Sequence, residues 1–286
     1  MTFEQQAGET PAGSRQKEAA LAALLRQLGS VVVGYSGGVD SVYLAAVAVE
    51  VLGPASVLAV TGRSASYPAV QREVAIACAR QLGLPHLEID TDEVGDPNYA
   101  ANRSNRCYFC KSELWSRLSA IAEERGYAAV LDGSNADDAG DYRPGMRAAR
   151  EHAVRAPLLE VGLTKAEIRA ESRRRGLPTW DQPSAPCLSS RLPYGLAVTP
   201  ERLRQVEAAE ELLRSHGVRE FRVRHHGDAA RIEVAPREMA RVQAIAAAVV
   251  GPILALGFQR VLLDVEGYRR GALNEGLGLV RIGLTS

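Results

Sequence analysis

The amino-acid sequence predicts an α/β fold, with a larger domain built on a parallel β-sheet and a smaller α+β domain after it. Between residues 31 and 131, short β-branched apolar runs alternate with amphipathic segments of helical length, which is the pattern of β-α-β units. After a loop rich in proline, serine and glycine over 178–195, the order becomes helix, two strands, helix and strand. We therefore expect one domain over 1–195 and a second over 196–286.

The first domain should alternate strands with helices. Each expected strand is a short apolar run that ends at turn residues, and the strands cover 31–35, 56–60, 86–89 and 128–131. The expected helices cover 16–28, 39–52, 69–82, 111–125 and 164–175, the last beginning at a capping box formed by Thr164 and Glu167. This alternation indicates a parallel sheet that is covered by helices on both faces.

The second domain should form a small α+β unit. Helices are expected over 200–216 and 236–250, with Glu210 and Glu211 on the surface of the first. Strands are expected over 220–224, 231–235 and 260–265, with the turn between the first two at 225–227.

Composition narrows the class of protein. The chain has 286 residues with 34 basic and 34 acidic side chains, and only 5% of its residues are aromatic. A strongly basic or aromatic surface for nucleic acid is therefore not indicated. No apolar run is long enough to cross a membrane, and four cysteines do not make a disulfide scaffold. We expect a cytoplasmic protein that binds neither membrane nor nucleic acid.

The strongest local pattern is Ser36-Gly37-Gly38-Val39-Asp40-Ser41, between an expected strand and an expected helix. The glycines allow the backbone to approach a ligand closely, and the amides at the helix start favour an anion. Ser36 and Ser41 can add hydroxyl donors, and a bridging Mg²⁺ would explain a carboxylate at Asp40 beside a phosphate. The pattern predicts a phosphate-binding loop.

Two further polar segments, 61–68 and 132–141, also follow expected strands. In parallel sheets, ligands bind beyond the carboxyl ends of the strands, so these segments should share one pocket with the 36–41 loop. Asp137, Asp138 and Asp141 would lie near that pocket, either as Mg²⁺ ligands or as caps of the loop.

The cysteines differ in their surroundings. Cys187 lies in a polar loop near Arg191, which suits a reactive thiol. Cys107 and Cys110 form a Cys-x-x-Cys pair at the start of a helix, which is half of an ordinary metal site. Cys78 lies among alanines and is expected to fill the core.

Arginines and histidines on one expected strand are also candidates. Arg222 and Arg224 are two residues apart and should point to the same face, where they would bind a substrate phosphate or face solvent. His225 and His226 are adjacent and should point to opposite faces, which disfavours a joint metal site.

The 36–41 loop lacks the lysine of a Walker P-loop and resembles the SGGxDS motif of PP-loop ATP pyrophosphatases, which cleave ATP to AMP and pyrophosphate. From about Gln16 onward, the chain is similar to the LarE family of ATP-dependent sacrificial sulfur transferases, which help to build the nickel-pincer nucleotide cofactor. The matching stretches are 36–41, 105–111, 132–138, 141–145, 187–195, 223–228 and 266–269.

The resemblance implies a PP-loop (adenine nucleotide alpha hydrolase-like) domain that uses ATP and Mg²⁺ to adenylate a pyridinium dicarboxylate mononucleotide. The donor cysteine would be Cys187, which attacks the acyl adenylate and is converted to dehydroalanine. Arg191, Arg222 and Arg224 would bind the substrate. The resemblance also implies a homo-oligomer and, as a partner, the nickel-insertion protein of the same pathway.

Other functions stay open at this point. Cys107, Cys110 and Cys187 together are similar to the cysteines of cluster-dependent tRNA thiolation enzymes, and three thiolates can hold a [4Fe–4S] cluster with one open iron. A tRNA thiolase would need RNA-binding features that the composition does not indicate. An amidating PP-loop ligase would leave the cysteines unexplained, and a non-catalytic nucleotide-binding module would bind ATP without releasing AMP.

Overall fold

The computed structural model describes residues 13–139, 144–265, 267 and 279–281 of the chain. These residues divide into two compact units. The first unit contains the described residues of Met1–Arg63 together with Ala69–Asp92 and Cys107–Ala185. The second contains Ser64–Pro68, Glu93–Arg106 and the described residues of Pro186–Ser286. Because two loops from the first half of the sequence join the second unit, the domain boundary at residue 195 stays a prediction.

The first unit is built on a four-stranded parallel sheet in the order β3-β2-β1-β4, as the alternation of elements predicted. Its strands are β1 (Val31–Gly34), β2 (Val57–Arg63), β3 (His86–Asp90) and β4 (Ala129–Leu131). Its helices are α1 (Ser14–Leu28), α2 (Val39–Leu52), α3 (Ala69–Gln81), α5 (Arg106–Arg125), α6 (Pro144–Glu151), α7 (Pro157–Glu160) and α8 (Lys165–Arg174), with short 3₁₀ turns η1 (Pro54–Ser56) and η3 (Ala136–Asp138).

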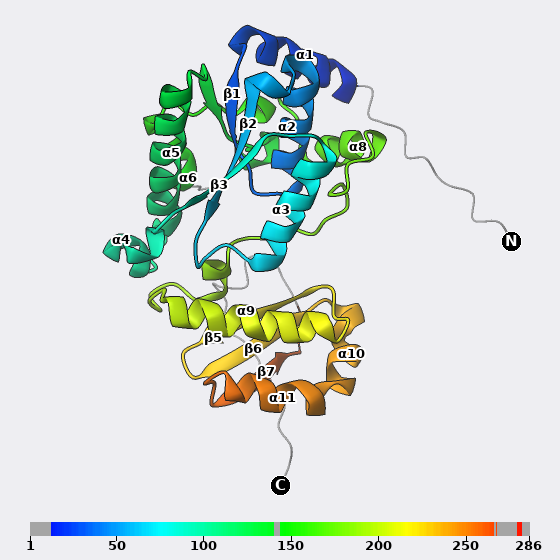
Figure 1. Cartoon of the computed structure of the whole chain (residues 1–286). Helices are drawn as coiled ribbons and strands as arrows, with labels where there is room; N and C mark the ends of the chain where they lie inside the picture. The colour runs from blue at the N-terminus through cyan, green and yellow to red at the C-terminus, as the bar shows by residue number, and fades with distance from the viewer. Residues whose placement is uncertain (1–12, 140–143, 266, 268–278, 282–286) are drawn as a thin grey trace, which may run out of the picture. The chain divides into compact units, whose positions relative to one another are not determined.

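Alternate residues of β1 pack into two different cores, which is why the strand is apolar throughout. Val31 and Val33 join the core cluster that includes residues of α1, α2 and α3. Val32 joins the cluster that includes Trp115 of α5 and residues of α6. Figure 1 shows α5 and α6 on one side of the sheet and α1, α2 and α3 on the other. The prediction of a sheet covered on both faces is therefore confirmed.

The second unit has a four-stranded mixed sheet in the order β5-β6-β7-β8, in which only β6 and β7 are parallel. Its strands are β5 (Phe221–His226), β6 (Ala229–Val234), β7 (Arg260–Asp264) and β8 (Leu279–Arg281). Its helices are α4 (Pro97–Ala100), α9 (Pro200–Ser215), α10 (Met239–Ala244) and α11 (Ala246–Ala255), with 3₁₀ turns η2 (Glu93–Gly95), η4 (Leu188–Arg191) and η5 (Pro236–Glu238). Apolar residues of α9, α11 and three strands form its core.

Two expectations for this unit are wrong in detail. The expected helix over 236–250 is broken into η5, α10 and α11, because Ile245 leaves helical geometry and the chain bends by 81°. The bend turns Val249, Val250 and Ile253 of α11 into the core. The turn between β5 and β6 lies at Gly227, whose φ is +70°, so β5 continues through both histidines.

Within the described residues, no single helix is both long and apolar enough to cross a membrane. The segments Pro236–Ala244 and Ala246–Ala255 reach that length and composition only when they are counted together across their bend.

Candidate functional site

The glycine loop of the first unit connects β1 to α2, with Gly38 as the N-cap of the helix. Gly37 has φ +67°, and a Cβ on it would lie 2.7 Å from both Cα and Cβ of Ala75 on α3. A side chain at this position would therefore meet both backbone strain and a collision. Gly38 has ordinary extended geometry, and a Cβ there would meet only the Ser36 hydroxyl, at 3.5 Å.

The two serines of the loop have different roles. Ser41 is 5% exposed, and its Oγ donates to the Gly38 carbonyl at 3.1 Å and accepts from the Ser36 backbone N at 3.2 Å. Gln71 of α3 holds the loop from outside by donating to the Ser36 carbonyl at 3.0 Å. Ser36 itself is exposed. Ser41 thus fixes the shape of the loop. The Ser36 hydroxyl lies 3.3 Å from Ser41 Oγ, and its contact with a ligand stays a prediction.

Asp40 lies in the first turn of α2 and is partly buried. Its Oδ2 forms an ion pair with Nζ of Lys165, and its Oδ1 is buried without a hydrogen-bond partner in the described parts of the chain. Burial raises the pKa of this carboxyl, Lys165 opposes the rise, and Asp138 adds to it. A carboxylate oxygen without a partner beside a phosphate-binding loop is a suitable ligand for Mg²⁺.

Lys165 is a site residue that the sequence pattern did not single out. The capping box at Thr164 and Glu167 is present as predicted, and it sets Lys165 at the start of α8. The Lys165 backbone N also donates to Oδ2 of Asp137, at 2.9 Å. The partner of the Lys165 ammonium group lies 125 residues away in the sequence, so no local pattern could have identified it.

The loop after β4 approaches the glycine loop, as expected for carboxyl ends of neighbouring strands. A Cβ on Gly133 would lie 3.3 Å from the Ser41 backbone N. Asp138 accepts from the Asn135 backbone N at 2.9 Å, so this carboxylate caps η3. Asp141 and the rest of 140–143 lie outside the described residues, as do Glu266, Tyr268 and Arg269. Of the third segment, 61–63 belongs to β2 and Ser64–Pro68 belongs to the second unit.

Cys187 belongs to the second unit and is the N-cap of η4. Its side chain is half-buried. Its carbonyl accepts from Ser190 Oγ at 2.7 Å and from Arg191 Nη1 at 3.1 Å, and the next backbone N, of Leu188, donates to the Ser66 carbonyl at 2.8 Å. The backbone on both sides of the thiol is therefore held in place.

Arg191 is 3% exposed and faces inward. Its Nε and Nη2 bind the two carboxylate oxygens of Glu210 at 2.9 and 3.1 Å, and its Nη1 donates to the Pro186 carbonyl at 2.6 Å. Glu210, at 5% exposed, is not on the helix surface as expected, because α9 turns it toward this guanidinium. Arg191 therefore positions the loop around Cys187, residues 186–196, which is called the cysteine loop below. A contact between Arg191 and substrate stays a prediction.

Residues of the 93–106 segment hold the following part of the cysteine loop. Tyr99 Oη lies 2.6 Å from Ser189 Oγ, and Arg106 Nη1 donates to the Ser189 carbonyl at 3.0 Å. Asn102, which is fully buried, donates from Nδ2 to the carbonyls of Pro193 and Leu196, each at 2.8 Å. None of these three partners has a signal in the sequence, since they lie more than eighty residues from the loop.

Arg224 of β5 is 7% exposed and is part of a buried ion network. Its Nε pairs with Glu233 at 3.0 Å, Glu233 lies 3.4 Å from Arg231, and Arg231 also pairs with Asp264. Arg224 Nη1 donates to the Ser190 carbonyl at 2.7 Å, which ties this network to the cysteine loop. Arg222 is half-buried and donates to the Phe221 carbonyl at 2.7 Å. Substrate binding by either arginine stays a prediction.

The two histidines of β5 point to opposite faces, as expected. Nε2 of His225 lies 2.9 Å from Gln205 Oε1, and the centroid of its ring lies 4.9 Å from that of Phe258, with the two rings tilted by 57°. His226 lies near Arg231 and Arg224. Burial is the largest cause that lowers the pKa of His226, and the positive charges of Arg231 and Arg224 lower it further.

Cys107 and Cys110 lie in the first turns of α5, which begins five residues earlier than expected. A spacing of three places both thiols on one side of the helix, Cys107 exposed and Cys110 half-buried. The described residues contain no group of three or more histidine, cysteine or acidic side chains arranged to hold a metal ion. Cys187 belongs to the other unit, so a cluster held by all three cysteines stays a prediction. Cys78 is 3% exposed in the core, and burial raises the pKa of its thiol.

The chain is similar to several known proteins. Residues 19–123 match a family model described as NAD synthase. The chain is 37% identical over 261 residues to the pyridinium-3,5-bisthiocarboxylic acid mononucleotide synthase of Lactiplantibacillus plantarum, covering 91% of this chain and 95% of that protein. It is 46% identical over 253 residues to an uncharacterized protein of Synechocystis sp., covering 88% and 94%. An uncharacterized protein of Methanocaldococcus jannaschii is 26% identical over 239 residues, covering 84% and 90%.

A parallel sheet whose first strand leads through Ser-Gly-Gly-Val-Asp-Ser into a helix defines an enzyme of the PP-loop class, which binds ATP. Within that class, the similarity to the Lactiplantibacillus plantarum synthase extends over nearly the whole chain. The chain belongs to the LarE family.

Proposed function

We propose that this protein uses ATP to adenylate a carboxylate of a pyridinium dicarboxylate mononucleotide and then replaces the carboxylate oxygen with sulfur. The product is supported by the name of the Lactiplantibacillus plantarum relative, a pyridinium-3,5-bisthiocarboxylic acid mononucleotide synthase. The observation that carries the proposal is the held position of Cys187, whose half-buried thiol lies in a loop fixed by Arg191 and Ser66. Reactive cysteines are partly exposed and lie near positive charge, whereas structural cysteines such as Cys78 are buried.

In the adenylation step, the substrate carboxylate attacks the α-phosphorus of ATP, and pyrophosphate leaves. The glycine loop and its amides would bind the departing phosphates, and Ser36 would add a hydroxyl donor. Asp40 Oδ1 would be a ligand of Mg²⁺, which supplies positive charge beside the phosphates. Lys165 would move its ammonium group from Asp40 to a phosphate oxygen as the anion binds.

In the sulfur step, the Cys187 thiolate attacks the acyl carbon and AMP leaves, which gives a thioester. A base then removes the Cα proton of Cys187, the bond between its Cβ and Sγ breaks, and the sulfur leaves as part of a thiocarboxylate. The chain keeps dehydroalanine and has lost the atoms of one H₂S. Because the product named for the relative has two thiocarboxylates, this route consumes two chains for each product molecule.

The test is the intact mass of protein that was purified without oxygen, before and after incubation with ATP, Mg²⁺ and the pyridinium dicarboxylate mononucleotide. We expect AMP and thiolated product to form while the chain loses the mass of H₂S at Cys187. The Cys187→Ala variant should form AMP without any thiolated product. A double variant, Cys107→Ala with Cys110→Ala, is the matched control and should lose H₂S like the unchanged protein.

Other outcomes point to the other functions. If thiolated product accumulates while Cys187 keeps its mass, the sulfur comes from outside, and iron and sulfide analysis of the unchanged protein tests the [4Fe–4S] prediction. If ammonium or tRNA is needed for product formation, the protein is an amidating ligase or a tRNA thiolase. If ATP binds and no AMP forms with any substrate, the protein is a nucleotide-binding module and the proposal is wrong.

A further inference from the structure

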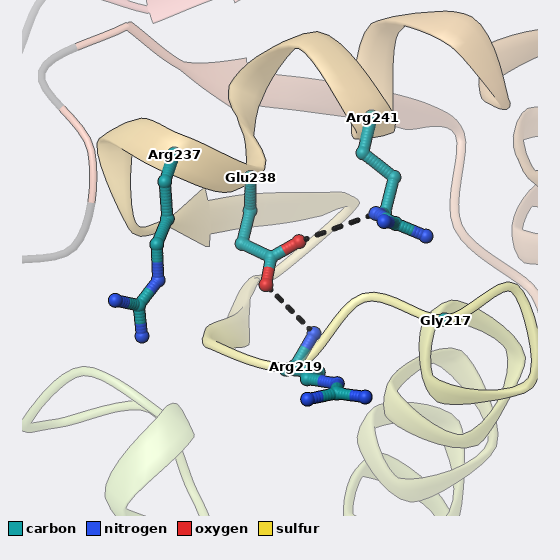
Figure 2. Close-up of a pocket in the computed structure, with 5 residues that line it drawn as sticks. All are labelled: Gly217, Arg219, Arg237, Glu238 and Arg241. Carbon is teal, nitrogen blue, oxygen red and sulfur yellow. Dashed lines mark hydrogen bonds and ion pairs between the residues drawn. The ribbon is translucent and has the colours of Figure 1, made fainter. Parts of the chain in front are cut away.

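The second unit contains an open hollow of about 400 Å³ that no step of the proposed reaction uses. It is lined by Gly217, Arg219, Arg237, Glu238 and Arg241. Figure 2 shows Arg237, Glu238 and Arg241 on consecutive helical turns, facing Gly217 and Arg219 on the loop that follows α9. Three of the five lining residues are arginines, so the hollow is strongly basic although the whole chain carries no net charge.

Glu238 joins the two sides of the hollow. It is 8% exposed, and its Oε1 accepts from the Arg219 backbone N at 3.2 Å while its Oε2 lies 3.5 Å from Arg241 Nε. Figure 2 shows both interactions as dashed lines from the one carboxylate. Both carboxylate oxygens of Glu238 are thus engaged with residues that line the hollow, and Glu238 neutralises at most one of the three guanidinium groups.

The other charges are only weakly balanced. Arg237 pairs with Glu220, and the side chains of this pair are 71% and 38% exposed, so water screens it. The Arg219 guanidinium has no ion-pair partner among the residues that the structure describes. Guanidinium groups that line one hollow repel one another, and an anion bound there would relieve that repulsion.

The backbone at Gly217 also allows Arg241 to come close to the loop after α9. Gly217 has φ +80°, and a Cβ there would lie 2.9 Å from Arg241 Nη1. The Arg241 guanidinium therefore lies directly against the loop, in space that any other residue would fill. Forked N–H donors from different segments are the arrangement that binds phosphate oxygens.

We propose that this hollow binds a small, multiply charged phosphate compound. The ligand class follows from three guanidinium groups around a concave volume of small-molecule size. The glycine loop is a separate phosphate site, because it belongs to the first unit and shares no residue with the hollow. The inference is independent of the sulfur chemistry, since it uses neither Cys187 nor the glycine loop.

The test is hydrogen–deuterium exchange of the full chain during titration with inorganic pyrophosphate, and separately with inorganic phosphate. We expect pyrophosphate to protect the backbone amides of 217–219 and 236–244, and inorganic phosphate to protect them only at higher concentration. In the double variant Arg237→Gln with Arg241→Gln, the concentration that gives half protection should rise at least tenfold. Protection at 36–41, which reports the glycine loop, should not change.

Arg260→Gln is the matched control, because Arg260 is an exposed arginine of the same unit that pairs with Asp228 at 2.7 Å. It should bind pyrophosphate like the unchanged protein. Absence of protection at 217–219 and 236–244 in the unchanged protein, or equal protection in the double variant and the control, would overturn the proposal. AMP formation by the double variant should stay normal, which separates this inference from the proposed function.

Discussion

At the scale of single residues, the site depends on one polar contact between distant parts of the chain. Asp40 is held partly buried beside the glycine loop, and Lys165 supplies the positive charge that makes its ionised form tolerable. The same contact places a cation next to the loop before any ligand binds. Lys165 therefore stabilises the Asp40 carboxylate and would also help to bind phosphate.

We expect Lys165→Met to lower the free energy of unfolding by about 1–2 kcal/mol at pH 7, because it leaves the Asp40 carboxylate without its partner. The folded-state pKa of Asp40 already lies above 3.8, and removing Lys165 raises it further. At pH values between the Asp40 pKa of the unchanged protein and the higher Asp40 pKa of the variant, the folded variant binds one extra proton. The loss of stability caused by Lys165→Met therefore grows as pH rises and is smallest near pH 4. Urea unfolding at pH 4 and pH 7 measures the difference.

Lys165→Arg is the control for this change, since it keeps the positive charge, and it should unfold nearly like the unchanged protein at both pH values. The same loss for Lys165→Met at both pH values would show that Lys165 acts through packing alone.

The site residues that could be predicted from the sequence are those whose role depends on residues close to them in the chain. The glycines of the loop and the capping box at Thr164 follow from backbone geometry within a few residues, and both are present. The partners Lys165, Glu210 and Asn102 act across long sequence separations, and no periodicity records such pairings.

At the scale of elements, the short turn η4 and the loop around it are held almost entirely by side chains. Arg191 and Arg224 bind carbonyls of the 186–190 segment from one side, and Asn102 and Arg106 bind carbonyls of the same loop from the 93–106 segment. The loop has little regular backbone structure of its own, so these side chains set the position of Cys187.

We expect Arg191→Lys to slow the loss of H₂S from Cys187 at least tenfold while leaving AMP formation nearly unchanged. Lysine keeps the charge but loses the fork that binds Glu210 and the Pro186 carbonyl together. The free energy of unfolding should fall by about 2 kcal/mol. Time-resolved intact mass and chemical unfolding measure the two effects.

The matched control is Arg214→Lys, which changes an exposed pair with Glu211 on the same helix and should cost less than about 0.5 kcal/mol. A normal rate for Arg191→Lys, accompanied by weaker binding of the mononucleotide, would instead assign Arg191 to the substrate.

Element boundaries were predicted best where apolar periodicity was strong. The helix over 39–52 has the expected bounds, and β1 differs by one residue. The break at Ile245 was missed because the sequence around it is apolar and rich in alanine, which is compatible with one long helix. Only the position of the core requires α11 to turn there.

At the scale of the whole molecule, one buried and two half-buried histidines connect stability to pH in both units. Burial lowers the pKa of His225 to about 4, and it also lowers the pKa of His226 and of His86, which bonds to Thr61 in the first unit. In each case the unfolded chain binds a proton at a higher pH than the folded chain does.

We therefore expect the free energy of unfolding to fall as pH decreases from about 6.5 toward 4, and to be insensitive to these histidines above that range. For His225, the difference between 6.5 and about 4 corresponds to roughly 3 kcal/mol once the pH is below both values. His225→Gln should flatten the pH dependence by close to one proton, as measured by urea unfolding between pH 4 and pH 8. Equal slopes for the two proteins would show that the pKa of His225 is the same in the folded and the unfolded chain.

The chain alternates between the two units, and this alternation affects how it folds during synthesis. The polypeptide passes between the two units five times, at residues 63, 68, 92, 106 and 185. Tyr99 leaves the ribosome ninety residues before Ser189, its hydrogen-bond partner. At a synthesis rate of about 5–20 residues per second, that segment waits roughly 5–20 seconds with its polar groups in water. The 93–106 segment can reach its final structure only after the cysteine loop has been synthesised, so the first half of the chain cannot complete its folding alone.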